Sequence, residues 1–500
     1  MSEMIPAALA RALDVMESRL HRAINPDMNQ RLFRVFRRDA AVYFLDGMIS
    51  SDFLQHYLLA PCMAREMEPL TGDMTDALMR MIPLAEAEAV ERFDEAIDAL
   101  MDGKAVLLVD GLCEAVCFDI RAYVRRSISP PLTESVVMGP HQGFNEALRD
   151  NVTLLRRILH TPDLIGEMTT VGDAIPTNLC VMYLYGAVDE DSLRRIKNRL
   201  QGVRTDHVLS IGALEQLLED RPFSLLPQCC LTERPDRAAS FLLEGQIVLV
   251  LDGAPQVLAM PISYLHLLHT PDDTAMRWQY GAFIRLIRWM GALCTLLLPA
   301  LFVAMVTYHP EALPVTLLTA ILESQAAVPL SIPAETLLML LMFNLINEAG
   351  TRVPGVVGNS LGTVSGLILG QAAVDAKLIH PLLIIIVAVS SLGSYAIPDY
   401  SLGIAFRIGQ LLFLAAGCVF GLYGVVLLLA ISAVRLCAMR SLGSPYGAPV
   451  SPERTHNPDI ALRLPLWHQR LRTWLGDARG MTRTFGRMRR WDGEHDENDQ

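Results

Sequence analysis

The sequence predicts an α/β N-terminal region of two similar subdomains, followed by an all-α polytopic membrane domain with four to six spans. Two observations lead to this fold class. Only nine charged residues fall in the 146 positions from Trp289 to Val434, and the rest of the chain has the ordinary charge content of soluble proteins. The region before Trp289 contains one strand-and-turn pattern twice. A purely soluble enzyme, a fibrous protein and a disordered protein are therefore excluded.

Residues 1–37 are predicted to form a helical extension. Charges are distributed throughout the first 26 residues, which favours a short amphipathic helix over a signal peptide, so we expect the soluble region to stay in the cytosol. The nine cysteines are an odd number without a CxxC pair, which favours reduced thiols over a metal site at Cys113 and Cys117. The net charge of −12 is spread out, and no basic patch predicts nucleic-acid binding.

Two segments of the soluble region repeat at an offset near 140 residues. GKAVLLVDGLCEAVCFD (103–119) and GQIVLVLDGAPQVLAMP (245–261) are each two apolar runs around an Asp-Gly turn, which predicts a hairpin. AVYFLDGMISSDFL (41–54) and VMYLYGAVDEDSL (181–193) match at nearly the same offset. We therefore expect a duplicated unit with subdomains at 38–128 and 175–268, each a mixed sheet with helices packed on one face.

Residues 129–174 are predicted to be a linker that contains a helix. Its GPxxGF sequence resembles a phosphate-binding loop but lacks the preceding strand and the Lys-Ser/Thr ending, so a structural hinge is favoured. From Phe144 to Leu159 the apolar residues recur with helical spacing. Arg149, Arg156 and Arg157 lie on the opposite face, and we expect this face to dock on acidic groups.

The transmembrane domain is predicted at 283–434. Trp289–Tyr308 is uncharged and long enough to span a bilayer, and 353–374, 378–397 and 408–434 are further strong spans. Arginines precede the first span and follow the last, so both chain ends should be cytoplasmic and the number of crossings even. Residues 311–350 form either two crossings or a re-entrant pair. The distribution of arginines is compatible with both, because the number of crossings is even in either case. The Arg-rich tail, 435–500, should be cytosolic.

Two polar or small-residue patterns suggest roles inside the membrane domain. The first pattern is a strip of glycines at intervals of four, which favours close packing of one helix on another: Gly358, Gly362, Gly366 and Gly370. The second pattern is a polar stripe at the end of a hydrophobic helix, which either lines a pore or caps the helix at the membrane interface: Asn344, Asn347, Glu348 and Arg352. No catalytic motif occurs, so neither an enzyme nor a cofactor is predicted.

The sequence resembles the GerA family of spore germination proteins. PPLTESVVMGPHQGFNEALRDNVTLLRRIL (130–159) is similar to that family's EPxTE…RGPREGFxExLxxNxxLIRRR, and LTERPDRAASFLLEGQIVLVLDGAPQVL, NEAGTRVPGVVGNSLGTVSGLILGQAAVDAKLIHP and SLGSPYGAPVSP follow in family order. The linker residues that carry the motif are Pro131, Glu134, Gly139, Pro140, Gly143, Phe144, Glu146, Asn151, Arg156 and Arg157. Met138 and His141 depart from the family's basic pair. Germinant receptor A subunits and the related stage V sporulation AF proteins both remain open.

The resemblance implies a multi-pass protein of the spore inner membrane that helps to convert nutrient sensing into ion release. It implies a homo-oligomer in the lipid bilayer, with a transporter-like B subunit and a lipoprotein C subunit as partners, and ions as the conducted species. A non-conducting scaffold for germination complexes is the alternative. A secondary transporter is a weaker alternative, because it needs inverted repeats, and the sequences of 289–350 and 353–434 do not repeat each other in this way.

Overall fold

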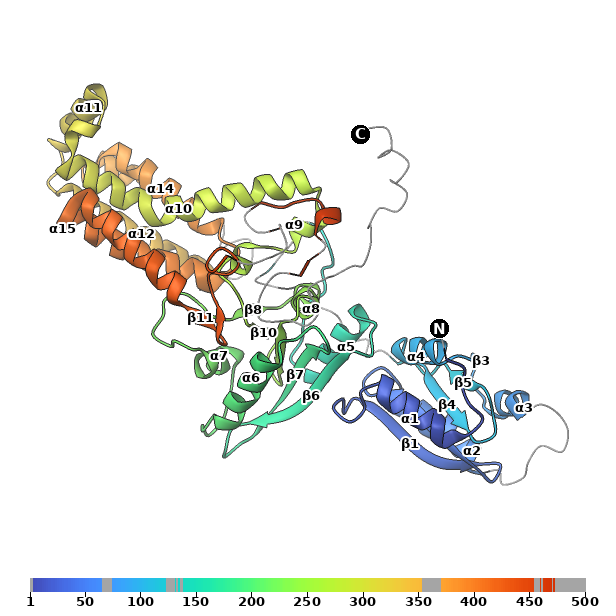
Figure 1. The fold of residues 1–500 in the computed structure, drawn as a ribbon. Coiled ribbons are helices and arrows are strands. Elements are labelled where there is room, and N and C mark those ends of the chain that lie inside the picture. Colours follow the sequence, from blue (N-terminus) through green and yellow to red (C-terminus); the bar gives the residue numbers. More distant parts are fainter. Residues whose placement is uncertain are drawn as a thin grey trace, which may run out of the picture.

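The computed structural model describes residues 3–64, 74–122, 131, 134, 138–352, 370–453, 459, 462–469, 471 and 472. Two five-stranded sheets with flanking helices are followed by a bundle of long helices (Figure 1). The predicted fold class, two similar α/β subdomains and then a helical region, is therefore confirmed. Short 3-10 turns lie at His266–Leu268, Pro310–Ala312 and Leu466–His468.

The first subdomain is a three-layer α/β/α unit. Its strands are β1 (Met28–Val35), β2 (Arg38–Leu45), β3 (Ala87–Val90), β4 (Ala105–Val109) and β5 (Ala115–Phe118), in the order β1-β2-β4-β5-β3. Helices α1 (Leu9–Arg19) and α4 (Phe93–Met101) pack on one face. A π-helix (Phe53–Leu59), α2 (Ala60–Ala64) and α3 (Met74–Met81) contribute to the core on the other face.

The second subdomain repeats this architecture. Its strands are β6 (Leu164–Val171), β7 (Thr177–Leu184), β8 (Cys230–Thr232), β9 (Ile247–Leu251) and β10 (Val257–Met260), in the matching order β6-β7-β9-β10-β8. Helices α5 (Leu148–Ile158) and α8 (Pro235–Leu243) cover one face, and α6 (Glu190–Gly202) and α7 (Ile211–Leu218) cover the other. The identical strand order confirms the predicted duplication.

Two details of the predicted subdomains differ from the structure. The expectation of mixed sheets is wrong for the described strands, whose pairs are all antiparallel, because strands joined by tight turns pair with each other. Helices also cover both faces of each sheet. The sheets begin at Met28 and Leu164, before the expected boundaries at 38 and 175. The first strand of each sheet contains several exposed polar residues, so its sequence lacks the continuous apolar run that predicts a buried strand.

The repeated Asp-Gly turn joins two strands and also binds the start of a helix in both subdomains. Asp110 Oδ1 accepts a hydrogen bond from the Leu9 amide at the start of α1 (3.0 Å), and Asp252 Oδ1 accepts one from the Leu148 amide at the start of α5 (3.3 Å). The glycine amides that follow bind the carbonyls of Ala7 and Glu146, both at 2.8 Å. Each turn therefore closes a predicted hairpin and also caps a distant helix.

In the described residues, the membrane region includes α10 (Trp278–Tyr308), α11 (Val315–Gln325), α12 (Ile332–Arg352), α14 (Pro381–Tyr395) and α15 (Tyr400–Ala438), and residues 370–375 are also helical. Of these, α10, α12 and α15 are long and apolar enough to cross a bilayer. The ambiguous interval 311–350 is one short helix, α11, and one long helix, α12. Most of the expected span 353–374 lies outside the described residues.

Helix α15 reverses direction at Gly421, where the backbone leaves helical geometry with φ +61°. Its two ends, Leu402 and Leu436, pack in the same apolar cluster. A straight helix would separate them by about 50 Å at 1.5 Å per residue. The expected single span at 408–434 is therefore a helical hairpin with two arms.

After α15 the chain returns to the second subdomain. A small hairpin of β11 (Arg440–Ser441) and β12 (Ser444–Pro445) follows the last helix residue, Ala438. Ser441 Oγ accepts a hydrogen bond from the Ile262 amide and donates one to the Gln228 carbonyl. The same subdomain thus holds the chain on both sides of the membrane region.

Candidate functional site

The linker motif folds around the start of α8. The Glu134 carboxylate accepts hydrogen bonds from the Thr232 hydroxyl (2.5 Å) and the Glu233 amide (3.2 Å), and it pairs with the buried Arg237. Arg234 has no exposed side-chain surface and donates to the Pro140 carbonyl at 3.1 Å. The first half of the linker is therefore fixed to the second subdomain by two buried guanidinium groups.

Several motif residues have structural roles that follow from their positions. Gly139 adopts φ +119°, a conformation that favours glycine, and a Cβ there would lie 3.8 Å from an Arg234 nitrogen. Phe144 is buried and its amide donates to the Glu233 carbonyl at 2.8 Å. Pro131 and Gly143 are also buried, whereas Glu146 is exposed and Arg157 half-buried. Met138 and His141, the departures from the family motif, are exposed.

The second half of the linker joins the two subdomains. Asn151 closes the turn before α5 by bonding both the amide and the carbonyl of Asn145. Arg156 is buried, and its Nη2 donates to Asp27 of the first subdomain at 2.7 Å and to Asn25 Oδ1 at 3.0 Å, while Nη1 donates to the Leu164 carbonyl.

The arginines of α5 behave differently from one another. Arg149 pairs with Asp46 at 3.1 Å on the surface, with 73% of its side chain exposed. The structure thus places Arg149 and Arg156 against acidic groups. Arg156 does so from the buried side of α5, not from the expected opposite face.

A second ion-pair cluster lies where the chain enters the membrane region. The buried Asp273, on α9 (Asp272–Ala275), accepts hydrogen bonds from Arg285 and Arg288 at the start of α10, each at 2.9 Å. Burial opposes ionisation of Asp273, but Arg288 and Arg285 nevertheless hold its pKa below the usual range. These arginines, predicted only to face the cytoplasm, therefore fix the orientation of α10.

The two clusters are connected. Arg237 Nη2 donates to the carbonyls of His266 and His269, each at 3.4 Å, and Arg288 Nη1 donates to the Leu268 carbonyl at 3.2 Å. A continuous set of contacts therefore runs from Glu134 in the linker, through Arg237 and the 266–269 backbone, to Arg288 in α10. His266 lies beside this path; burial, Arg237 and Arg285 lower its pKa to about 4, so it is neutral at pH 7.

The helices of the membrane region meet at a buried polar centre that the sequence analysis missed. Thr295 of α10 and Ser390 of α14 exchange hydroxyl-to-carbonyl hydrogen bonds at 3.0 and 3.1 Å, and Gln410 of α15 donates to the Ser390 hydroxyl. Gly291 and Gly393 bring the backbones of α10 and α14 together at this level. A search for small residues recurring on two different spans would have suggested this contact.

A second missed pair lies where α12 and α14 begin. Glu335 of α12 and His380, which precedes α14, are fully buried and joined by a 2.8 Å Oε2–Nδ1 contact. Gln325 of α11 donates to the other Glu335 oxygen at 2.8 Å. Glu335 and His380 stand 45 positions apart in the sequence, so no local pattern associates them.

The predicted pore and packing residues are only partly described. Asn344 and Asn347 are half-buried and Glu348 is exposed on α12, and Asn347 accepts a hydrogen bond from the Tyr395 hydroxyl. The Arg352 side chain and Gly358, Gly362 and Gly366 lie outside the described residues. Gly370 is buried, and a Cβ there would lie 3.8 Å from Ile384 of α14.

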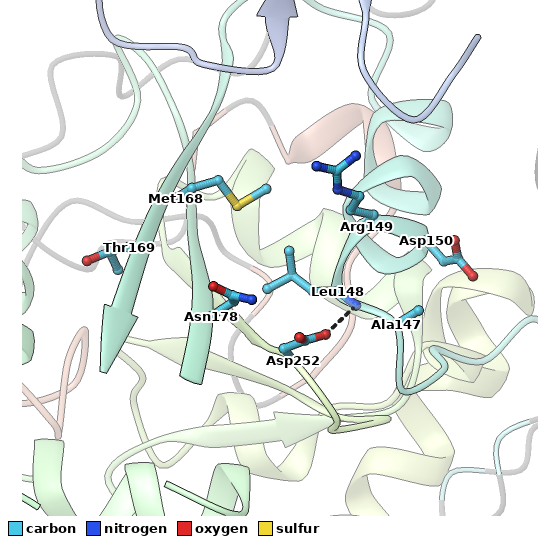
Figure 2. A pocket seen from close by; sticks show the side chains of 8 residues that line it. All are labelled: Ala147, Leu148, Arg149, Asp150, Met168, Thr169, Asn178 and Asp252. Atoms are coloured by element: carbon cyan, nitrogen blue, oxygen red, sulfur yellow. Dashed lines mark hydrogen bonds between the residues drawn. The ribbon is translucent and has the colours of Figure 1, made fainter. Parts of the chain in front are cut away.

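A surface pocket of about 530 Å³ lies at the start of α5. Its walls come from the first turn of α5, from β6 and β7, and from the Asp-Gly turn, with Met168, Asn178 and Asp252 among the residues that line it (Figure 2). Figure 2 shows the Asp252 carboxylate hydrogen-bonded to the Leu148 amide, so this carboxylate already has a donor within the chain. In the described part of the chain, no group of three or more His, Cys, Asp or Glu side chains could hold a metal ion.

Comparisons with known proteins agree with one another. Residues 14–474 match the model of the Bacillus/Clostridium GerA spore germination protein family. The chain is 33% identical to Spore germination protein KA of Bacillus subtilis (strain 168), covering 91% of this chain and 85% of that protein, and 34% identical to Spore germination protein GerLA of Bacillus cereus, covering 82% and 84%. A solved structure, the N-terminal domain of the A subunit of the Bacillus megaterium spore germinant receptor GerK3, is 24% identical with a TM-score of 0.40 and covers 52% of this chain and 97% of that one.

Proposed function

Because this chain belongs to the GerA family of spore germination proteins, we propose that it is a membrane subunit of a spore germinant receptor. In this role it couples nutrient sensing to ion release across the spore inner membrane. Its partners are further copies of itself, a transporter-like B subunit, a lipoprotein C subunit, the lipid bilayer and the conducted ions.

The observation that carries this proposal is the continuous set of contacts from Glu134 to α10. The linker, the second subdomain and the first membrane helix are joined through buried ion pairs, so a shift of the linker changes the position of α10. Buried pairs of this kind tolerate only a few arrangements, since an unpaired buried charge is costly. A two-state contact between a cytosolic domain and membrane helices is what coupling requires.

The helix directions support a topology with both chain ends in the cytoplasm. Glu335 contacts His380 at the starts of α12 and α14, and Asn347 contacts Tyr395 at their ends, so these helices run parallel. A return crossing is needed between them, and the expected span at 353–374 supplies it. With α10 and the two arms of α15, the proposed membrane domain has six crossings, an even number.

The ion path is proposed to run along the polar stripe of α12. Asn344, Asn347, Glu348 and Arg352 follow the apolar run 337–343 of α12, and such polar groups usually face a bundle interior or water. Homo-oligomeric assembly would place this stripe of each copy around one axis, with the Gly358–Gly370 strip packing neighbouring helices.

The test is Glu134→Gln, with the exposed Glu146→Gln of the same motif as the matched control. Removing the Glu134 charge leaves the buried Arg237 without its carboxylate partner, so spores that carry this variant should release ions more slowly, at unchanged subunit abundance. The control should germinate normally. Equal germination of both variants would contradict coupling through this path.

The scaffold alternative is tested separately with Glu348→Gln. If the variant retains its partners in pull-downs but ion release falls, the stripe belongs to the ion path. Retained partners together with unchanged ion release would favour the non-conducting scaffold.

A further inference from the structure

The loop between α7 and β8, residues 219–229, carries an exposed apolar surface. Phe223 is fully exposed, and Leu225 and the neighbouring Leu217 of α7 are about half exposed. Burying one side chain of this size is worth about 1.5–3 kcal/mol, so an aromatic ring left entirely in water is unfavourable. This surface is not needed for the core of the second subdomain, where Leu226 supplies the apolar contact.

The position of this loop is fixed by the segment that follows α15. The Ser224 hydroxyl donates to the Met439 sulfur at 3.7 Å, one residue after the helix ends at Ala438. Further along, the Gly443 amide donates to Asp220 at 3.0 Å, and the Tyr446 hydroxyl donates to the Pro227 carbonyl at 2.8 Å. A loop held against the residue that directly follows a membrane-spanning helix lies at the level where that helix leaves the bilayer.

The charges around the loop are arranged to suit an anionic membrane surface. Arg221 within the loop is exposed, and Arg440 beside Met439 is also exposed. The acidic side chains are engaged inside the protein: Asp220 pairs with Arg199, and Glu219 accepts a hydrogen bond from the Gln228 amide. Segments that lie in the membrane–water interface combine Trp, Phe or Leu side chains with Lys or Arg, which anionic headgroups attract.

We propose that the 219–229 loop inserts Phe223 and Leu225 into the headgroup region of the cytoplasmic leaflet. The loop then anchors the second subdomain to the lipid surface beside the exit of α15. This inference rests on the proposal that α15 spans the bilayer. Lipid is the proposed occupant because the loop contacts Met439, the residue that follows the end of the spanning helix.

The experiment uses the full-length chain in nanodiscs of phosphatidylcholine and phosphatidylglycerol. The exposed Cys113 and Cys437 are replaced by Ser, and a single cysteine is introduced for labelling with bimane. Burial raises the pKa of Cys62 and Cys117 to about 12, so these thiols stay unreactive near pH 7. The parent without the new cysteine is labelled in parallel and its signal subtracted.

Three positions are compared, Phe223→Cys, Ile175→Cys and Leu412→Cys. Ile175 is an exposed apolar residue at the turn between β6 and β7, and Leu412 is exposed in the middle of an α15 arm. We expect lipids with a headgroup nitroxide to quench the label at 223, with no loss of fluorescence at 175. Lipids with a nitroxide deep in the acyl chain should quench the label at 412.

The outcomes separate the inference from its premise. Quenching at 412 without quenching at 223 would overturn the lipid anchor and leave the spanning helix intact. A label at 223 that is shielded from aqueous iodide but not quenched by lipid would assign the surface to a second protein, which also overturns it. No quenching at 412 would overturn the spanning arrangement itself.

Discussion

Arg156→Met should open the interface between the two subdomains. Arg156 and Asp27 have only 3% and 9% of their side chains exposed. In the described part of the chain, the Asp27 carboxylate accepts two hydrogen bonds, and both come from Arg156. Removing one partner of a buried pair typically costs about 3–5 kcal/mol, because the other charge stays buried. At 1.4 kcal/mol per factor of ten, this is about a 100-fold or larger increase in the open population.

Native-state hydrogen exchange of the full-length protein measures this opening. The amides of residues 164–166, which adjoin Arg156, should exchange about 100-fold faster or more in Arg156→Met. The matched control is Arg149→Met, which also removes an α5 arginine paired with an aspartate of the first subdomain. That pair is exposed, and exposed pairs contribute about 1 kcal/mol or less.

A double variant isolates the cause. Arg156→Met combined with Asp27→Leu leaves no unpaired charge, so most of the lost protection should return. If the double variant exchanges as fast as the single one, or if Arg149→Met has the same effect as Arg156→Met, the buried ion pair is not what holds the subdomains together.

Three further outcomes are expected. Gly393→Ala should lower the unfolding temperature of detergent-purified protein, by overpacking of about 1–3 kcal/mol against the Gly291 backbone. Gly403→Ala should not, because a Cβ there would lie 3.9 Å from the Ser394 carbonyl oxygen, an ordinary van der Waals contact. Equal melting of the two variants would contradict close α10–α14 packing. Burial, then Glu219 and Asp399, raise the pKa of Glu215 from 4.5 to about 7, so Glu215 should make the free energy of unfolding fall by about 3 kcal/mol as the pH rises from 4.5 to 7. Glu215→Gln should remove this contribution, and an unchanged pH dependence of denaturation would contradict it. Gly366→Leu should stop oligomer assembly or ion conduction at normal membrane abundance, and normal conduction would place the glycine strip against lipid.

Local patterns predicted the parts of the fold that depend on neighbouring residues. The Asp-Gly turns at 110 and 252 each need glycine at a positive φ, and apolar runs on both sides give an unambiguous hairpin. Their repetition at one offset was sufficient to predict two similar subdomains. The role of the same aspartates as caps of α1 and α5 was not predictable, because it joins residues about 100 positions apart.

Features that depend on tertiary packing were missed for the same reason. The hairpin in α15 requires Gly421 to turn the chain, but glycine is common within membrane helices, and the apolar run continues through it. The Glu335–His380 pair was missed because each residue alone resembles an isolated polar position near a helix end. Arg156 was expected on the face opposite the apolar residues of the helix, since helical periodicity does not show which arginine meets a buried aspartate of another subdomain.

The return of the chain after α15 has a consequence for the order in which the protein is made. Met439 and Tyr446 belong to one apolar core of the second subdomain, and Leu442 belongs to the other. The ribosome synthesises these residues after all the membrane helices, more than 170 positions later than β10. The second subdomain therefore acquires its last core residues only when the membrane helices are complete, so its final stability reports that the whole chain has been correctly inserted.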